Sequence, residues 1–140
     1  MIDTRFSITI QIMTSLAYGE GKLLSSEELA LVLKTNPSFI RKLVAKLVEH
    51  DLVVAFRGKG GGIKLAKAPD KISLKEIYIA SIDNKPFIFS HNKPIVKACP
   101  VSCSMAEIFC DIVKGMEDST LHYLSKYYLS DLVDKIKKNV

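Results

Sequence analysis

The stretch VVAFRGKGGGIKLAK, residues 53–67, holds four glycines within five positions, surrounded by four basic side chains. Glycine clusters of this kind often bind phosphate, so a nucleotide-binding loop is the first hypothesis. A P-loop needs Gly-Lys followed by Ser or Thr at a helix start, and a dinucleotide fingerprint needs a third glycine three residues after its second. Here Gly60 follows Lys59, and Ile63 stands where the third glycine is required. Both nucleotide-binding interpretations therefore fail.

The residues that flank the glycines predict two strands instead. LVVAF at 52–56 is rich in β-branched residues, which favour strands. IKLAK at 63–67 alternates apolar and basic residues, as a returning strand does. We therefore predict a β-hairpin whose tip carries Arg57 and Lys59.

Two segments before the hairpin predict helices. Residues 4–19 alternate like a strand near their start but also fit helical spacing, and we expect a helix that ends at Gly19. Ser25 and Ser26 precede two acids, which is typical of a helix start. The apolar stripes at helical spacing are Phe6, Ile10, Met13 and Ala17 in the first segment and Leu29, Val32 and Leu33 in the second.

Residues 36–51 show the clearest helical pattern. Asn36 is a good N-cap, and Pro37 suits the first helical position. The expected apolar face consists of Phe39, Ile40, Leu43, Val44, Leu47 and Val48. The opposite face consists of Ser38, Arg41, Lys42, Ala45, Lys46 and Glu49. Three helices, a strand, a glycine hairpin and a strand are the order of a winged helix-turn-helix, with this helix as the recognition helix.

The charge distribution supports a nucleic-acid partner. Residues 34–67 hold eight basic residues and two acids, a net charge of +6, whereas the whole chain carries +5, so the remainder sums to −1. A basic stretch on a near-neutral remainder is typical of a nucleic-acid binder. A solvated basic surface is the alternative that charge alone leaves open.

The second half of the chain predicts a region for dimerisation and sensing. We expect a helix that begins at Ser73, a connecting loop at 83–98, and then an amphipathic helix of nearly thirty residues with a soft interruption at Gly115. Its length suggests packing against a second copy, and packing on its own domain is the alternative. The predicted units are 1–82 for DNA binding, 83–98 as connection and 99–140 for dimerisation and sensing. The apolar face of the long helix is Met105, Ile108, Phe109, Ile112 and Met116.

The sequence RGKGGGIKLAK, preceded by LVEHDLV and followed by ISLKEIYIA, closely resembles the Rrf2 family of bacterial transcription regulators. The starting residues MIDTRFSITIQIM and the late segment YLSDLVDKI are similar to the first and last helices of that family, so the resemblance covers nearly the whole chain. It implies a mostly α fold with a small β-hairpin, a winged helix-turn-helix and a long dimerisation helix. It also implies a homodimer that binds double-stranded DNA as a repressor or activator, and we expect a repressor.

The resemblance also implies the DNA contacts. The family reads the major groove with the first turns of the recognition helix and inserts the wing arginine, here Arg57, into the minor groove. Arginine suits guanine, asparagine suits adenine, and a minor-groove arginine favours A·T-rich segments. The expected DNA-binding residues are Asn36, Ser38, Phe39, Arg41, Lys42, Arg57, Gly58 and Lys59.

Three cysteines lie near the start of the long helix. Several members of the family hold an iron–sulfur cluster on three cysteines, but Cys99, Cys103 and Cys110 have gaps of three and six residues, whereas the cluster pattern has longer, nearly equal gaps. The CPV at 99–101 resembles the cluster-free members. We therefore expect no cofactor, and a cluster-dependent regulator of the same family remains the alternative.

Cys99 and Cys103 are the expected sensing residues. If Pro100 is the first helical position, Cys99 is the N-cap, where the helix dipole and Lys97 stabilise a thiolate. A thiol sensor, a soft-metal site and an apolar seam remain open, as does a small-molecule effector. For Cys110 we favour a buried, small apolar role. The three histidines are scattered, so no metal site is expected.

Several other classes of protein are disfavoured. The 140 residues suit one domain, and no apolar run approaches the roughly 20 residues that span a bilayer. The start lacks the apolar segment of a secretory signal, so we expect a cytoplasmic protein without a membrane partner. No catalytic constellation supports an enzyme. A winged-helix module that binds proteins without DNA is the remaining alternative, disfavoured by Arg57, Lys59 and the cationic helix face.

Overall fold

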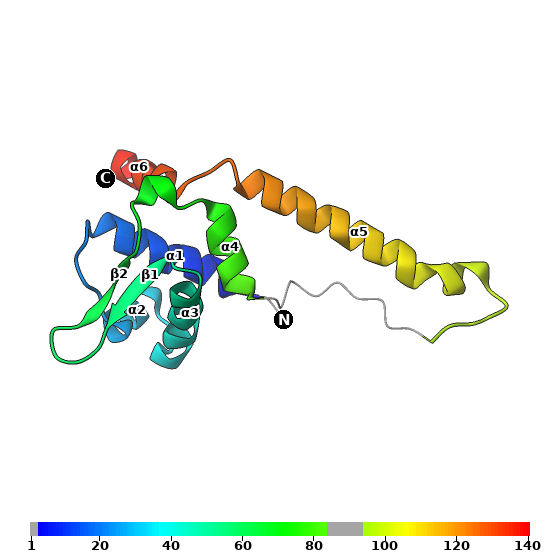
Figure 1. Ribbon diagram of the computed structural model, residues 1–140, viewed down its shortest axis with the longest axis horizontal. Coiled ribbons are helices and arrows are strands. Elements are labelled where there is room, and N and C mark those ends of the chain that lie inside the picture. The colour runs from blue at the N-terminus through cyan, green and yellow to red at the C-terminus, as the bar shows by residue number, and fades with distance from the viewer. Residues whose placement is uncertain (1–2, 84–93) are drawn as a thin grey trace.

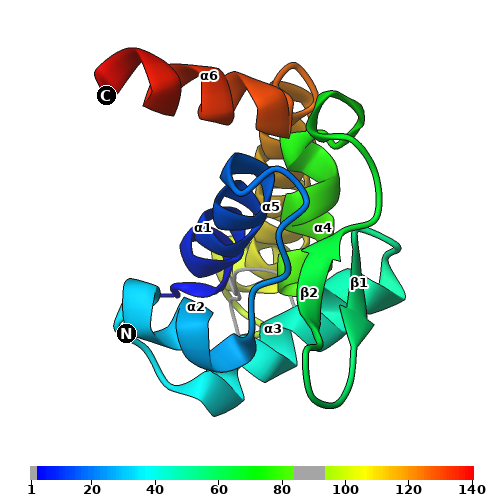
Figure 2. The same ribbon diagram turned by 90° about the vertical axis from the view of Figure 1, so that its left-hand side faces the viewer.

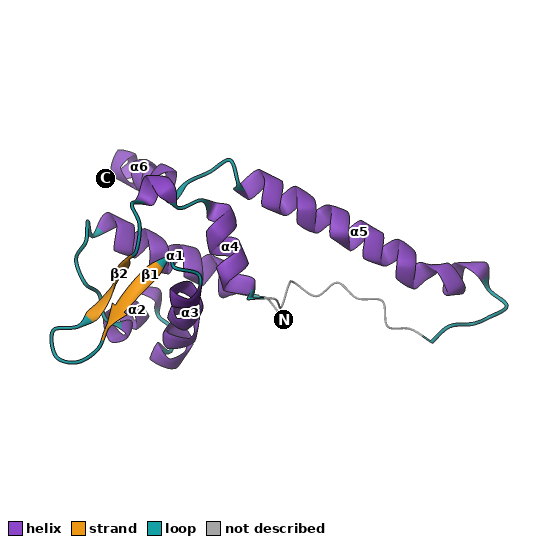
Figure 3. Cartoon of the chain, in the orientation of Figure 1, coloured by secondary structure: helices purple, strands orange, loops and turns teal. Residues whose placement is uncertain are grey.

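The computed structural model describes residues 3–83 and 94–140, and residues 84–93 of the expected connecting loop lie outside these ranges. Figure 1 shows a body of short helices and a hairpin from which one long helix projects. Figure 3 shows that the strands of the described residues form a single hairpin within a largely helical chain, which confirms the predicted fold class. The elements are α1 (Arg5–Tyr18), α2 (Ser26–Leu33), α3 (Pro37–Glu49), β1 (Val53–Phe56), β2 (Gly62–Leu65), the short 3-10 helix η1 (Pro69–Lys71), α4 (Leu74–Ile82), α5 (Pro100–Leu124) and α6 (Leu129–Asn139).

The helix starts are fixed by the predicted N-caps. The Ser25 hydroxyl accepts a hydrogen bond from the Glu28 N–H at 3.0 Å, and the Asn36 side chain accepts one from the Ser38 N–H at 2.7 Å. Each cap satisfies a backbone donor that the helix itself leaves without a partner. Together they place the turn between α2 and α3, where Lys34 adopts the left-handed conformation (φ +52°).

Helix α1 lies at the centre of the body, and Figure 2 shows it between α6 and the lower layer of α2 and α3. Its buried side chains pack with those of α3 and α4 in one apolar core. The largest fully buried side chains in this core are Ile12, Met13, Leu16, Leu29, Ile40, Leu47, Leu52, Ile72, Ile77 and Leu129. This core fixes the exposed face of α3 relative to the hairpin.

The hairpin is antiparallel, with Val53 opposite Leu65 and Phe56 opposite Gly62. Leu24, just before α2, exchanges two backbone hydrogen bonds with Ile63, at 3.1 and 2.8 Å. Strand β2 is therefore tied, near its first residue, to the segment just before α2, and the tip of the hairpin extends beyond the body (Figure 1).

Helix α6 packs against α1 and η1 and buries Leu129 and Val133. Two backbone hydrogen bonds close this end of the body: Leu129 N–H donates to Ile72 at 2.8 Å, and Leu74 N–H donates to Tyr127 at 2.9 Å. The predicted unit boundaries stay a prediction. The contacts of α6 nevertheless show that residues 129–139 lie against α1 and η1.

Helix α5 runs without a break for 25 residues, so the interruption expected at Gly115 does not occur. Its C-terminal end packs on the body through Leu121 and Leu124, and the remainder projects away (Figure 1). Ile108, Ile112 and Met116 are consequently exposed.

Val32, Val48 and Cys110 were each expected to be buried, but all three are exposed. Val32 is exposed because the eight-residue α2 buries Leu29 and Ala30 and turns its other side to solvent. Cys110 is exposed, in contradiction to the buried role favoured above, because it lies on the part of α5 that extends beyond the body.

Candidate DNA-binding interface

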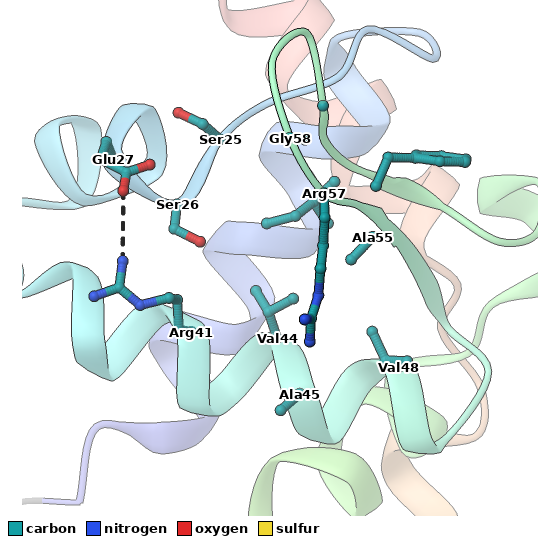
Figure 4. A pocket seen from close by; sticks show the side chains of 14 residues that line it. Ser25, Ser26, Glu27, Arg41, Val44, Ala45, Val48, Ala55, Arg57 and Gly58 are labelled. Atoms are coloured by element: carbon teal, nitrogen blue, oxygen red, sulfur yellow. Dashed lines mark hydrogen bonds and ion pairs between the residues drawn. The ribbon is translucent and has the colours of Figure 1, made fainter.

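An open groove of about 760 Å³ runs between the start of α2, the exposed side of α3 and the hairpin (Figure 4). Its charged lining residues are Glu27, Arg41 and Arg57. Its floor is formed by small and apolar residues of α3 and of the hairpin, including Val44, Ala45, Val48 and Ala55. The groove thus brings together an arginine from the predicted recognition helix and an arginine from the predicted wing.

The exposed face of α3 carries Ser38, Arg41 and Lys42. The Arg41 guanidinium is 3.4 Å from the Glu27 carboxylate through Nη1 and 3.4 Å from the Ser38 hydroxyl through Nη2. Both contacts are long and exposed, so they hold Arg41 weakly. The face therefore offers two cations and one hydroxyl to a partner.

Two other predicted contacts have structural roles at the start of α3. The side-chain oxygen Oδ1 of Asn36 serves as the helix cap. A two-bond contact with adenine would therefore compete with the Ser38 N–H for this oxygen. Phe39 is half-buried and packs against the core. The structure thus ties both residues to the folding of α3 as well as to its surface.

The hairpin tip presents Arg57 and Lys59, which are both exposed. Figure 4 shows the Arg57 side chain pointing from the wing across the groove towards α3. Gly58 and Gly60 have φ angles of +89° and +81°, which side-chain-bearing residues rarely adopt. At Gly61 an added Cβ would lie 2.2 Å from the Phe56 carbonyl oxygen, so the hairpin itself requires glycine there, whatever it binds.

Two charged residues beside the predicted contacts were not expected from the sequence. Lys64 lies on the hairpin with its Nζ 5.4 Å from the centre of the Phe56 ring, a distance typical of a cation–π contact. The alternation of IKLAK already placed Lys64 on one side of a strand. Glu27 is the other, and no sequence signal pairs it with Arg41, because only the turn between α2 and α3 brings them together.

A charged cluster joins the far end of α3 to α4. Lys46 Nζ is 2.7 Å from Asp83 Oδ2, and this carboxylate raises the pKa of Lys46 above its ordinary value by hydrogen bonding and by charge. The His50 Nε2 lies 3.9 Å from the other oxygen of Asp83. Asp83 is the C-cap of α4, so the cluster fixes the end of the recognition helix against the body.

The cysteines lie at the other end of the molecule. Cys99 is half-exposed at the N-cap position of α5, as predicted, but its side chain makes no capping hydrogen bond. The Cys103 thiol is 3.7 Å from the Val96 carbonyl oxygen and 3.6 Å from that of Lys97. Across residues 3–83 and 94–140, no group of three or more His, Cys, Asp or Glu side chains could hold a metal ion.

The fold and the groove define a class: a winged-helix DNA-binding regulator, with α3 as recognition helix and the hairpin as wing. The chain belongs to the Rrf2 family, since the model of that family, described as an iron-dependent transcriptional regulator, matches residues 2–135. The chain is a DNA-binding transcriptional regulator of this family.

Relatives with similar sequences are named as helix-turn-helix transcriptional regulators. The helix-turn-helix regulator NsrR of Bacillus subtilis (strain 168) is 27% identical over 135 residues, which cover 93% of this chain and 86% of that protein. YwnA of the same organism, also named as a helix-turn-helix regulator, is 26% identical over 136 residues, 97% of this chain and 99% of that protein.

Solved structures show the same fold. A transcriptional-regulator structure from Lactobacillus plantarum aligns with a TM-score of 0.78 at 23% identity and covers 97% of this chain and 91% of its own. IscR of T. potens aligns with a TM-score of 0.70 at 21% identity, covering 99% and 90%. CymR, the global cysteine regulator of B. subtilis, aligns with a TM-score of 0.67 at 21% identity, covering 96% and 97%.

The iron-dependence in the family description raises the question of a cluster, and the three cysteines do not fit one within a single chain. Cys103 and Cys110 lie on the continuous helix α5, and Cys99 caps it. At 1.5 Å of rise per residue, Cys99 and Cys110 are separated by about 16 Å along the axis. Three thiolates spread in this way cannot converge on one inorganic core.

No helix in the described ranges is both long enough and apolar enough to cross a membrane.

Proposed function

We propose that the chain is a sequence-specific regulator that binds operator DNA as a homodimer, with α3 in the major groove and the wing in the adjacent minor groove. One observation carries the proposal: Arg41 of α3 and the wing arginine Arg57 line the same open groove. We expect the regulator to act as a repressor, because a dimer bound on an operator blocks other proteins from that DNA.

The proposed contacts divide by chemistry. Arg41 reads a guanine edge, and Lys42 and Ser38 bind bases or phosphates beside it. Arg57 enters the minor groove, with Gly58 and Lys59 against its sugar-phosphate wall. Asn36 and Phe39 contact DNA only at the first turn of α3, because their capping and packing roles restrict them.

The proposed dimer forms through α5. This helix exposes Ile108, Ile112 and Met116 along one side, outside the contact with its own body. Three large apolar side chains in a row on a projecting helix favour burial against a second copy. Such a pair would hold two DNA-reading bodies at a fixed distance, as binding to a two-part operator requires.

The proposed signal acts through Cys99 and Cys103 by thiol chemistry or by a small molecule, without an iron–sulfur cluster. The support is the position of Cys99 at the start of α5 and its partial exposure. We also propose that the protein acts in the cytoplasm and catalyses no reaction.

The test measures the binding of duplexes, chosen by selection from a random pool, by fluorescence anisotropy. Arg57→Ala is expected to weaken binding by about 1–3 kcal/mol because it removes a minor-groove contact. The control is Lys138→Ala, an equal loss of charge on α6, which lies at the opposite end of the body from α3 and the hairpin tip (Figure 2).

Arg41→Ala is expected to reduce the preference for the selected sequence, since a two-bond contact confers base choice whereas a phosphate contact mainly adds affinity. Equal losses on selected and random duplexes would make Arg41 a phosphate contact. Unchanged binding by Arg57→Ala would remove the wing from the interface.

A further inference from the structure

Glu27 lies in the first turn of α2 and faces Arg41 of α3 across the groove (Figure 4). Its Oε1 is 3.4 Å from Arg41 Nη1, and both side chains are largely exposed to solvent. The two residues are fourteen positions apart, and the turn between the helices brings them together.

An acid at this place is unexpected on a surface that binds DNA. Among the described residues that line the groove, Glu27 is the one acid, and DNA phosphates repel a carboxylate. Helix capping does not require Glu27 either. Ser25 caps α2, and Glu28 already supplies a negative charge to its first turn.

The Glu27 carboxylate limits the positions that the Arg41 side chain occupies. Arg41 is a long side chain that could otherwise reach phosphates on either side of a groove. In the structure Nη1 of Arg41 faces Glu27 and Nη2 faces Ser38. These two weak contacts favour one orientation of its planar fork before DNA arrives, and a side chain with a preferred orientation loses less freedom on binding.

We propose that Glu27 is a specificity-determining positioning residue: it holds Arg41 for contact with a base edge and withholds it from phosphates. The inference rests on the proposed function, in which Arg41 reads a base. Because the ion pair is long and exposed, a guanine that offers two acceptors replaces it at little cost. A phosphate in its place would face the Glu27 carboxylate.

The test compares wild type with Glu27→Gln, which keeps the shape of the side chain and removes its charge. Affinity is measured on a selected duplex and on a random duplex over a series of salt concentrations. We expect tighter binding to the random duplex and a log–log salt slope steeper by about 0.9, since Arg41 gains one phosphate. The ratio of selected to random affinity is expected to fall roughly 5-fold, a part of what an arginine–guanine contact confers.

Two controls separate positioning from simple charge. Glu28→Gln removes the same charge one residue away, from an exposed carboxylate, and is expected to change both affinities less than 2-fold. In the Arg41→Ala background, Glu27→Gln is expected to leave the affinity ratio unchanged, because Glu27 acts through Arg41.

Three kinds of outcome overturn the inference. Glu28→Gln could match Glu27→Gln, or Glu27→Gln could lower the ratio equally with Arg41→Ala present; either result would show general repulsion. An unchanged ratio and salt slope in Glu27→Gln would show that the pair has no role in binding. If wild type prefers no sequence at all, the proposed function fails first and the inference with it, a result distinct from the other two.

Discussion

Helices α3 and α5 carry similar apolar stripes, but the chain buries only one of them. In α3, Ile40 and Leu47 are 0% exposed. In α5, Ile108 is 48% exposed and Ile112 is 50% exposed. Helix α3 is enclosed by α2, α4 and β1, whereas α5 contacts the body near one end and projects beyond it (Figure 1).

The difference teaches that one amphipathic pattern serves two purposes. In α3 the stripe holds the helix in place, so its polar face can be aimed at DNA. In α5 the described residues of the chain leave the stripe about half exposed, and burial of large apolar side chains is the main stabilising force available to it. We therefore expect α5 to find its cover in a second copy.

The largest expected effect tests whether α5 pairs with a second copy of the chain. Ile112→Asp is expected to weaken self-association by about 4 kcal/mol or more, because each of two copies would bury a carboxylate in an apolar seam. Sedimentation equilibrium measures the change. Lys114→Asp, on the opposite side of α5, is expected to leave association intact. A monomeric wild type, or a dimer that tolerates Ile112→Asp, would contradict the pairing of α5.

The next effect tests α3. Leu47→Ala is expected to lower the free energy of unfolding by about 3 kcal/mol, because it leaves a cavity in the core. Val48, the next residue, is 40% exposed, and Val48→Ala is expected to cost less than about 1 kcal/mol. Urea denaturation at one protein concentration measures both. Equal costs would show that α3 is not anchored as the structure has it.

A smaller effect concerns the start of α5. Mild oxidation is expected to change the operator affinity of wild type about 5-fold and to leave that of Cys99→Ser unchanged, because a modified first turn alters the angle between the two DNA-reading bodies. Cys110→Ser, two turns and more along the helix, is the control and is expected to keep the response.

The same sample tests the cofactor. Protein purified without air is expected to contain no stoichiometric iron and sulfide. Stoichiometric amounts of both would overturn the proposal of a cluster-free regulator. An identical oxidant response in wild type and Cys99→Ser would remove Cys99 as the sensor.

The smallest effect lies in α4, which packs against both α3 and α5. Ser73 and Glu76 form a capping box, in which the Ser73 N–H donates to Glu76 at 2.9 Å, and Lys67 pairs with the same carboxylate at 3.0 Å. Partial burial pushes the pKa of Glu76 up, but these hydrogen bonds and the Lys67 charge bring it below its ordinary value. Ionised Glu76 therefore stabilises the fold.

Glu76→Gln is expected to cost about 0.5–1 kcal/mol at neutral pH, the range of a helix cap. A carboxyl whose pKa is lowered by folding contributes its stability above its unfolded pKa and loses it as the pH falls through its folded pKa. The gap between wild type and variant should therefore shrink below the ordinary glutamate range. A gap that stays constant down to strong acid would show that the charge of Glu76 is not involved.

The local signals in the sequence were sufficient for most of the fold. Asn36, Pro37 and Ser73 place helix starts through backbone chemistry that involves near neighbours, and the structure has helices that begin there. The prediction that Val32 and Cys110 are buried was wrong. Helical spacing shows which residues share a face but not whether another element covers that face. The same limit hid the packing of α6 on α1.

The candidate site also has features that could be predicted from the sequence and features that could not. The exposed cations of α3 and the wing could be predicted, because an amphipathic helix and a glycine hairpin determine which side chains point outwards. The pair of Glu27 and Arg41 could not, since it depends on the angle between two helices. The need for glycine at position 61 could not be predicted either, because the nearest obstacle to a side chain there is the Phe56 carbonyl of its own hairpin.

The most direct test of the whole account is selection of duplexes from a random pool by the purified protein, with the mass of the resulting complex measured in solution. The account predicts one enriched inverted repeat, bound by two copies of the chain, with half-site centres roughly 10 base pairs or a multiple apart. A pool without enrichment, or a single unrepeated site bound by one chain, would contradict it.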